Sequence, residues 1–217
     1  MFVFLLGRPG CGKSEIYRRL TDKLVSKNIY KKFQRVDDFP KLWRIFQEDE
    51  KTGKWQHCVK TPDGGYKVTD DNVWDSILIE VNEDILKQKE PDKIIFVEFS
   101  RPNYVHSLKN FSEEVLEDSI LVYIDCSFET CWKRNVRRHQ QALAAGTDDH
   151  LVSREEMEKT YLYDDKEKLL EFCNSKGIPV IVINTDIEGT DEHLVKASEI
   201  LSEEIRKFKE KCRQQKK

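Results

Sequence analysis

The chain has 217 residues, a formal net charge of −3 and a pI of about 6.0, and 38% of its residues are hydrophobic. This length suits an α/β domain with a subdomain attached, and the mild acidity argues against nucleic acid as a partner, because nucleic-acid binders usually present a basic surface. No apolar run approaches the roughly 20 residues of a membrane span and no export signal opens the chain, so we expect a cytoplasmic protein without a membrane partner.

Short apolar runs alternate along the chain with charged segments of helical spacing. Strands are predicted at residues 2–6, 33–36, 93–99, 120–125 and 178–184. Helices are predicted between them, most clearly at residues 14–26 and 191–211, where apolar residues recur at helical spacing. Because several of the strands are apolar throughout, they predict a parallel sheet covered by helices on both faces.

Two longer segments interrupt this alternation of strands and helices. Residues 37–92 form an insertion between the second and third strands, and Pro62-Asp63-Gly64-Gly65 within it predicts a hairpin. Residues 144–152 form a second excursion, between two helical stretches within residues 134–165. Neither segment contains an internal repeat, and we expect residues 1–217 to form a single domain.

The segment Gly7-Arg8-Pro9-Gly10-Cys11-Gly12-Lys13-Ser14 fits the P-loop pattern G-x-x-x-x-G-K-[ST]. It follows a predicted strand and precedes a predicted helix, as this pattern requires. Its glycines let backbone N–H groups turn toward phosphate oxygens, and the helix directs its positive end to the same place. Lys13 would reach the β- and γ-phosphates, and the Ser14 hydroxyl would ligate Mg²⁺. We therefore expect the cofactors ATP and Mg²⁺ to bind at residues 7–14.

Later strand ends distinguish among the classes of P-loop protein. A GTPase usually carries an N-K-x-D guanine reader, whereas this chain has Asn184-Thr185-Asp186 without a lysine. A motor or AAA ATPase usually ends a strand in Asp-Glu, whereas here the third strand ends in Val97-Glu98-Phe99-Ser100-Arg101. Both departures favour a kinase of a small molecule or a nucleotide.

Glu98 and Arg101 at a strand end resemble the nucleoside and nucleotide kinase branch of P-loop proteins, which the adenylate kinase-like enzymes represent. The resemblance implies a three-layer P-loop kinase fold with a parallel five-stranded sheet, a lid at residues 134–165 and a substrate-side insertion. It also implies that Arg101 contacts the acceptor. By their spacing, Arg134 and Arg138 match two lid arginines, one that stacks on adenine and one that meets the transferring phosphates. Planar cations there offset the charge that spreads over the γ-phosphoryl oxygens.

The second strand ends in Val36-Asp37-Asp38-Phe39. Asp-Asp-Phe at this place is similar to the uridine kinase and nicotinamide riboside kinase group, which phosphorylate hydroxyls. The similarity implies that Asp37 accepts the proton of the acceptor hydroxyl, since an attacking alcohol needs a proton acceptor. Asp38 or Glu98 would then hold Mg²⁺ through water. The alternative for the two aspartates is an Asx turn or a helix cap at the strand end.

These features predict an ATP- and Mg²⁺-dependent kinase of a small metabolite, with a nucleoside or a related hydroxyl compound as the acceptor. One alternative is a nucleoside-monophosphate kinase in which Arg44 and Arg101 clamp the acceptor phosphate. An alternative from another class is an ATP-binding regulatory protein with little phosphotransfer. Four aromatic residues of the insertion either stack on a planar acceptor or form the core of the insertion: Trp43, Trp55, Tyr66 and Trp74.

Overall fold

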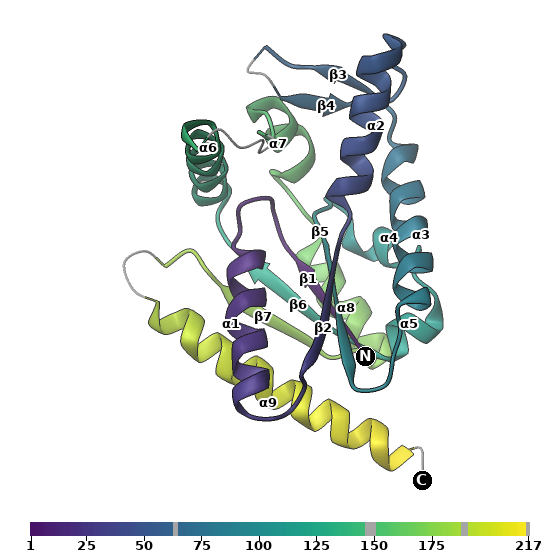
Figure 1. Cartoon of the computed structure of the whole chain (residues 1–217), viewed down its shortest axis with the longest axis vertical. Helices are drawn as coiled ribbons and strands as arrows, with labels where there is room; N and C mark the ends of the chain where they lie inside the picture. Colours follow the sequence, from purple (N-terminus) through teal and green to yellow (C-terminus); the bar gives the residue numbers. More distant parts are fainter. Residues whose placement is uncertain (63–64, 146–150, 188–190, 216–217) are drawn as a thin grey trace.

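A computed structural model describes residues 1–62, 65–145, 151–187 and 191–215. At its centre lies a five-stranded parallel sheet with the strand order β2-β5-β1-β6-β7 (Figure 1). The strands are β1 (Phe2–Leu6), β2 (Lys32–Asp37), β5 (Lys93–Phe99), β6 (Ser119–Asp125) and β7 (Val180–Asn184). All five predicted strands are present with bounds within two residues of the prediction, which confirms the predicted α/β class and its parallel sheet.

Helices cover both faces of this sheet, which gives three layers (Figure 1). In chain order they are α1 (Lys13–Ser26), α2 (Phe39–Thr52), α3 (Asn72–Lys87), α4 (Tyr104–Leu108), α5 (Glu113–Glu117), α6 (Phe128–Ala144), α7 (Arg154–Tyr161), α8 (Lys166–Lys176) and α9 (Glu192–Gln215). No helix of the described ranges combines the length and the apolarity needed to cross a bilayer.

The strands supply side chains to two separate cores, because successive residues of a strand point to opposite faces. On β1, Phe2, Phe4 and Leu6 pack toward α3, α4, α5 and α8, whereas Val3 and Leu5 pack toward α1 and α9. All five side chains are fully buried. The continuous apolar run that predicted this strand therefore reflects burial on both faces of the sheet.

The carboxyl ends of the parallel strands meet at one edge of the sheet. In the register of the sheet, Leu6 at the end of β1 lies opposite Phe99 of β5 and Tyr123 of β6, and Asp37 at the end of β2 lies opposite Glu98. The segments that follow these strands are therefore neighbours in space, although they are far apart in the sequence. Ligands of open α/β sheets bind at such an edge.

The insertion between β2 and β5 contains α2, the strands β3 (Cys58–Lys60) and β4 (Tyr66–Val68), and α3. The two strands pair in antiparallel register, which confirms the predicted hairpin; residues 63–64 of its turn lie outside the described ranges. The Asp49 carboxylate of α2 accepts hydrogen bonds from the backbone N–H groups of His57 and Cys58, at 2.7 and 3.0 Å. The hairpin is thus fixed to α2 at its base.

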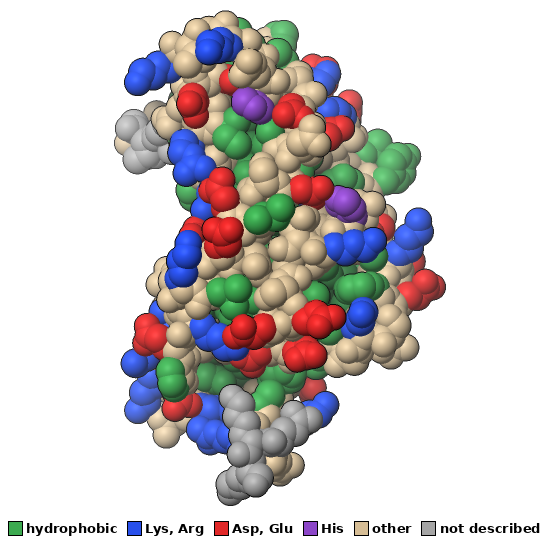
Figure 2. Space-filling view, turned by 90° about the vertical axis from the view of Figure 1, so that its right-hand side faces the viewer, with side chains coloured by type: hydrophobic (Ala, Val, Ile, Leu, Met, Phe, Trp, Pro, Cys, Tyr) green, Lys and Arg blue, Asp and Glu red, His purple; other side chains and the backbone are tan. Residues whose placement is uncertain are grey.

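The second predicted excursion begins where α6 ends, and residues 146–150 within it lie outside the described ranges. Next along the chain, the Ser153 hydroxyl caps α7 by accepting a hydrogen bond from the Glu156 N–H. On the outer surface over α3 and α4, positive and negative side chains are interspersed (Figure 2). That face lacks the single-sign basic field typical of nucleic-acid binders.

Candidate active site

A cavity of about 670 Å³ opens at the carboxyl edge of the sheet. Its lining comes from the P-loop and arginines of α6, and from α2, β4 and α7. Catalytic and ligand sites of small molecules commonly have this size. The lining includes these predicted site residues: Pro9, Gly10, Gly12, Lys13, Ser14, Asp37, Asp38, Glu98, Arg101, Arg134 and Arg138.

Gly10 and Gly12 of the P-loop have backbone angles that other residues rarely adopt. Gly10 has a φ of 83°, and a Cβ added there would lie 2.4 Å from the Cys131 carbonyl oxygen, so another residue would be both strained and too large. Gly12, with a φ of 103°, precedes the first turn of α1. The unpaired N–H groups of that turn therefore begin at the loop, where an anion would be stabilised.

The Lys13 ammonium lies over this loop at the cavity wall. Its Nζ donates hydrogen bonds to the backbone oxygens of Gly7 and Arg8, at 2.9 and 3.0 Å, and to Ser100 Oγ at 2.9 Å. The Ser100 hydroxyl in turn donates to the Gly7 oxygen at 2.6 Å. Ser100 was not among the predicted site residues, and the one signal for it was a hydroxyl placed directly after β5.

Arg35 of β2 was also missed, and it connects the P-loop serine with the acidic edge of the sheet. Its Nη2 donates to Glu98 Oε2 at 2.8 Å and to Ser14 Oγ at 3.0 Å, and it lies 3.8 Å from Asp37 Oδ2. Glu98 is 2% exposed, and this burial raises the pKa of its carboxyl while the nearby cations oppose the rise. Arg35 thus holds two predicted metal-binding side chains together.

These oxygens fit the ligand chemistry of Mg²⁺, which prefers hydroxyl, carboxylate, phosphate and water oxygens. Glu98 Oε1 is buried at this place and has no hydrogen-bond partner in the described part of the chain. The described residues contain no group of three or more His, Cys, Asp or Glu that could hold a metal alone. A metal here would therefore depend on phosphate and water oxygens as well as on the protein, as is usual for Mg²⁺ in kinases.

The two aspartates at the end of β2 lie in different surroundings. Asp37 Oδ1 accepts a hydrogen bond from the Phe39 N–H at 2.9 Å, which is the Asx turn weighed as the alternative, yet the side chain also lines the cavity. Asp38 is 8% exposed and forms an ion pair with Arg101 Nη1 at 2.7 Å. Burial raises the pKa of Asp38 to about 6, although Arg101 lowers it.

Arg101 lines the same cavity and has two buried donors without a hydrogen-bond partner among the described residues. Its guanidinium stacks on the Trp74 ring at 4.4 Å and is 4% exposed. Nη1 is engaged by Asp38 and by the Ser100 carbonyl oxygen, whereas Nε and Nη2 are buried without a hydrogen-bond partner among the described residues. Nε and Nη2 form one edge of the guanidinium, so Arg101 can bind a carbonyl or an oxyanion with two parallel hydrogen bonds.

The remaining predicted arginines differ in their placement. Arg134 Nη2 donates to the Thr185 carbonyl oxygen at 2.8 Å, so its side chain runs between the cavity and the end of β7. Arg138 lies at the mouth of the cavity with its neighbour Arg137. Arg44 is exposed on the outer side of α2, where it pairs with Glu80 at 3.0 Å, and the structure does not bring it to the cavity.

The aromatic residues of the insertion divide between the two roles left open by the sequence. Trp43 and Trp55 pack against the buried core of the insertion. Tyr66 and Trp74 contact that core too, but they also line the cavity, and the Tyr66 ring stacks on Phe46 with ring centroids 4.7 Å apart. The insertion therefore contributes a largely aromatic part of the cavity lining.

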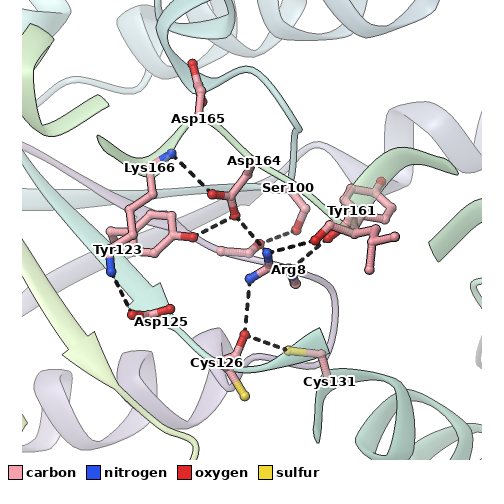
Figure 3. A network of polar contacts seen from close by, with 12 residues as sticks. Arg8, Ser100, Tyr123, Asp125, Cys126, Cys131, Tyr161, Asp164, Asp165 and Lys166 are labelled. Atoms are coloured by element: carbon pink, nitrogen blue, oxygen red, sulfur yellow. Dashed lines mark hydrogen bonds and ion pairs between the residues drawn. The ribbon is translucent and has the colours of Figure 1, made fainter. Parts of the chain in front are cut away.

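Two P-loop side chains turn away from the cavity. Cys11 is fully buried, and this burial raises the pKa of its thiol, so it is a packed loop residue. The Arg8 side chain extends instead toward the ends of β6 and α7, where it donates to the carbonyl oxygens of Cys126 and Tyr161 (Figure 3).

No protein-family model matches the chain, and no curated protein matches it. Among solved structures it is similar to a gluconokinase from Sinorhizobium meliloti 1021, with a TM-score of 0.54 and 12% identity over 94% of this chain and 93% of that one. It is also similar to a putative kinase from Chloroflexus aurantiacus J-10-fl, with a TM-score of 0.52 and 11% identity over 95% and 96% of the two chains. The chain thus has the fold of P-loop kinases.

Proposed function

We propose that the protein is an ATP- and Mg²⁺-dependent kinase that phosphorylates a hydroxyl group of a small metabolite of the nucleoside type. One observation carries the proposal: Lys13 and Ser14 of the P-loop line the same cavity as the carboxylate of Asp37. A phosphate cradle and a proton acceptor that face one space are the parts that phosphoryl transfer to an alcohol needs.

We call the part of the cavity beside the P-loop and the α6 arginines the donor half, and the part beside Asp38, Arg101 and the aromatic residues the acceptor half. The donor half binds the triphosphate. Backbone N–H groups of residues 7–14 and the Lys13 ammonium hold the β- and γ-phosphates, while Arg134 and Arg138 reach the transferring group from α6. A second cavity, of about 630 Å³, lies beyond Arg134 and is lined by Gly12, Thr185 and other residues. It is large enough for the base and the ribose of the nucleotide.

Ser14 and Glu98 are the residues that would hold Mg²⁺, directly or through water. The metal would neutralise charge on the phosphate oxygens. We assign Asp38 to the acceptor half, because its carboxylate is paired with Arg101. Arg35 would exchange its contacts with Ser14 and Glu98 when a cation binds these oxygens, since both cations need the same lone pairs.

Asp37 accepts the proton during transfer. The acceptor oxygen forms a bond to the γ-phosphorus, the bond from that phosphorus to the bridging oxygen breaks, ADP leaves, and the hydroxyl proton passes to the Asp37 carboxylate. The Phe39 N–H fixes Oδ1 of this carboxylate and so orients it.

The acceptor half favours a planar molecule. Its walls include Phe46, Tyr66 and Trp74, whose rings can pack on a flat heterocycle. The two unpartnered N–H groups of Arg101 are buried, and a ring carbonyl or an anionic substituent that displaces the groups covering them would accept two hydrogen bonds. This combination supports a nucleoside-like acceptor of the kind that uridine and riboside kinases use. The position of Arg44 argues against the nucleoside-monophosphate alternative, because that alternative needs Arg44 as one of two phosphate clamps and Arg44 lies outside the cavity.

The test is an assay of ADP formation with MgATP and a matched panel of nucleosides and their monophosphates. We expect acceptor-dependent turnover with at least one nucleoside-type alcohol, loss of turnover in Lys13→Ala, and a reduction of about 10²- to 10⁴-fold in Asp37→Asn. Arg44→Ala, outside the cavity, is the matched control and should be unaffected.

Turnover with monophosphates alone, insensitive to Asp37→Asn, would establish the nucleotide kinase. Negligible turnover across the panel, together with an ATP-dependent protein partner, would establish the regulatory protein.

A further inference from the structure

Arg8 is a P-loop residue whose side chain is used entirely inside the protein (Figure 3). Its Nε donates to the Tyr161 carbonyl oxygen at 2.7 Å, Nη1 to the Cys126 oxygen at 3.1 Å and Nη2 to the Leu162 oxygen at 3.3 Å. Its Nη2 also lies 3.5 Å from Asp164 Oδ2, and the side chain is 15% exposed. A single guanidinium thus donates in three directions to three backbone carbonyls.

These carbonyls lie at the two ends of one segment. Cys126 comes directly before Ser127, the N-cap of α6, and Tyr161 and Leu162 close α7. The last carbonyls of a helix lack partners within the helix and carry its negative dipole end, so a guanidinium there both satisfies and stabilises them. Arg8 therefore contacts the start of α6 and the end of α7 simultaneously.

Both helices contribute side chains to the lining of the cavity. α6 carries Arg134 and Arg138 to the donor half, and α7 brings Glu156 and Tyr161 to the acceptor half. Neither helix can shift relative to the P-loop without changing the contacts of Arg8.

The backbone of Arg8 is tied to the phosphate-binding lysine. Lys13 Nζ donates to the Arg8 carbonyl oxygen at 3.0 Å, while the Arg8 side chain holds the ends of α6 and α7. The three N–H groups of the Lys13 ammonium are engaged by Gly7, Arg8 and Ser100, so a Lys13 that turns to a bound phosphate must give up at least one of these contacts. For a coupling through Arg8, the contact given up is the one to the Arg8 oxygen. The change then reaches Arg8, and through it both helices, by a continuous chain of contacts.

We propose that Arg8 is a positioning residue that couples phosphate binding at the P-loop to the order of α7, and so links the donor half of the cavity to the acceptor half. The inference rests on the proposed function, because it requires a nucleotide in the cradle. Lysine cannot replace this arginine, since an ammonium carries its three N–H groups on one atom, whereas the three carbonyls here are reached by three separate nitrogens of a planar guanidinium.

The experiment measures hydrogen exchange of the described residues of α6 and α7 with and without saturating MgAMPPNP, with binding followed by calorimetry. We expect AMPPNP to slow exchange in α7 by at least about fivefold in the wild type, although α7 lies on the acceptor side and no acceptor is added. In Arg8→Lys, AMPPNP should still bind and still protect α6, whose arginines meet the phosphates, but the protection of α7 should be lost.

Two matched variants separate coupling from stability. Arg206→Lys makes the same change on the outer side of α9, where Arg206 pairs with Glu203 and Glu210, and should leave the exchange pattern unchanged. Asp164→Asn removes the charged partner of Arg8 but keeps the three carbonyl contacts. It should lower the melting temperature and retain the α7 signal.

The outcomes distinguish the two proposals. Wild-type protein that does not bind MgAMPPNP would overturn the proposed function and this inference with it. Binding without an effect on α7, or an unchanged α7 effect in Arg8→Lys, would overturn the coupling alone. Loss of the α7 signal in Asp164→Asn to the same extent as in Arg8→Lys would also overturn it, because the signal would then follow stability.

Discussion

Asp38 should make the protein less stable as pH rises through the acidic range. Its carboxyl has a pKa of about 6 in the folded chain against a reference of 3.8, because burial disfavours the charged form and Arg101 only partly compensates. Between these two values the folded state binds more protons than the unfolded state. Linkage then requires that stability falls as pH rises through that window.

The size of the effect follows from the shift. A difference of roughly two pKa units corresponds to about 3 kcal/mol, present as extra stability below pH 4 and lost above pH 6. Asp38→Asn keeps the shape of the side chain and can still accept a hydrogen bond from Arg101, but it cannot titrate. The variant should therefore lack this part of the pH dependence.

Urea unfolding at a series of pH values from 4 to 7 measures the effect as a double difference between the wild type and Asp38→Asn, which removes the contribution of all other acids. Asp22→Asn, at a side chain 74% exposed on α1, is the matched control. We expect the wild type to lose roughly 2 kcal/mol relative to Asp38→Asn between pH 4 and pH 7, because the rest of the full effect of about 3 kcal/mol develops below pH 4, where the unfolded carboxyl becomes protonated. Parallel profiles of unfolding free energy against pH for the wild type and Asp38→Asn would refute the reasoning.

Two further predictions concern the site. Arg35→Met should lower the free energy of unfolding by about 2 kcal/mol, since it leaves the Glu98 carboxylate buried without its cation. The same substitution in a Glu98→Gln background should lower the free energy of unfolding by less, and equal losses in urea unfolding would contradict the ion pair. Gly10→Ala should abolish nucleotide binding in calorimetry, because the added Cβ would collide with the Cys131 oxygen. Gly53→Ala is also at positive φ but has nothing within 4 Å, so it should lower stability and keep binding; equal nucleotide affinities of the two variants would contradict the assigned role of Gly10.

The features predictable from the sequence are those encoded over short stretches. The P-loop has fixed spacing and lies between a strand and a helix. The apolar runs at residues 2–6, 93–99 and 120–125 predict the sheet most clearly, because strands buried on both faces are apolar throughout. Asp37 and Glu98 were placed together because both end parallel strands, and the register sets them opposite each other.

The features that could not be predicted depend on rotation about a helix axis or on contacts between distant segments. Arg44 follows Phe39 and Leu42 on α2, but those residues line the cavity and Arg44 falls on the opposite side of the same helix. In the sequence, Arg35 resembles an ordinary charged residue of an edge strand. Its role depends on the pairing of β2 with β5, which brings Glu98 within hydrogen-bond distance. Arg8 belongs to the P-loop pattern, and no local signal indicates that its side chain contacts residues 126, 161 and 162.

The central claim is that residues 7–14 hold the triphosphate of a nucleotide with Lys13 as its cation. Calorimetric titration of the wild type and of Lys13→Ala with MgAMPPNP measures this most directly. We predict one binding site per chain in the wild type and an affinity at least about 100-fold weaker in Lys13→Ala, because a charged hydrogen-bond donor to the phosphates is lost. Equal affinities in the two proteins, or no binding in either, would contradict the account.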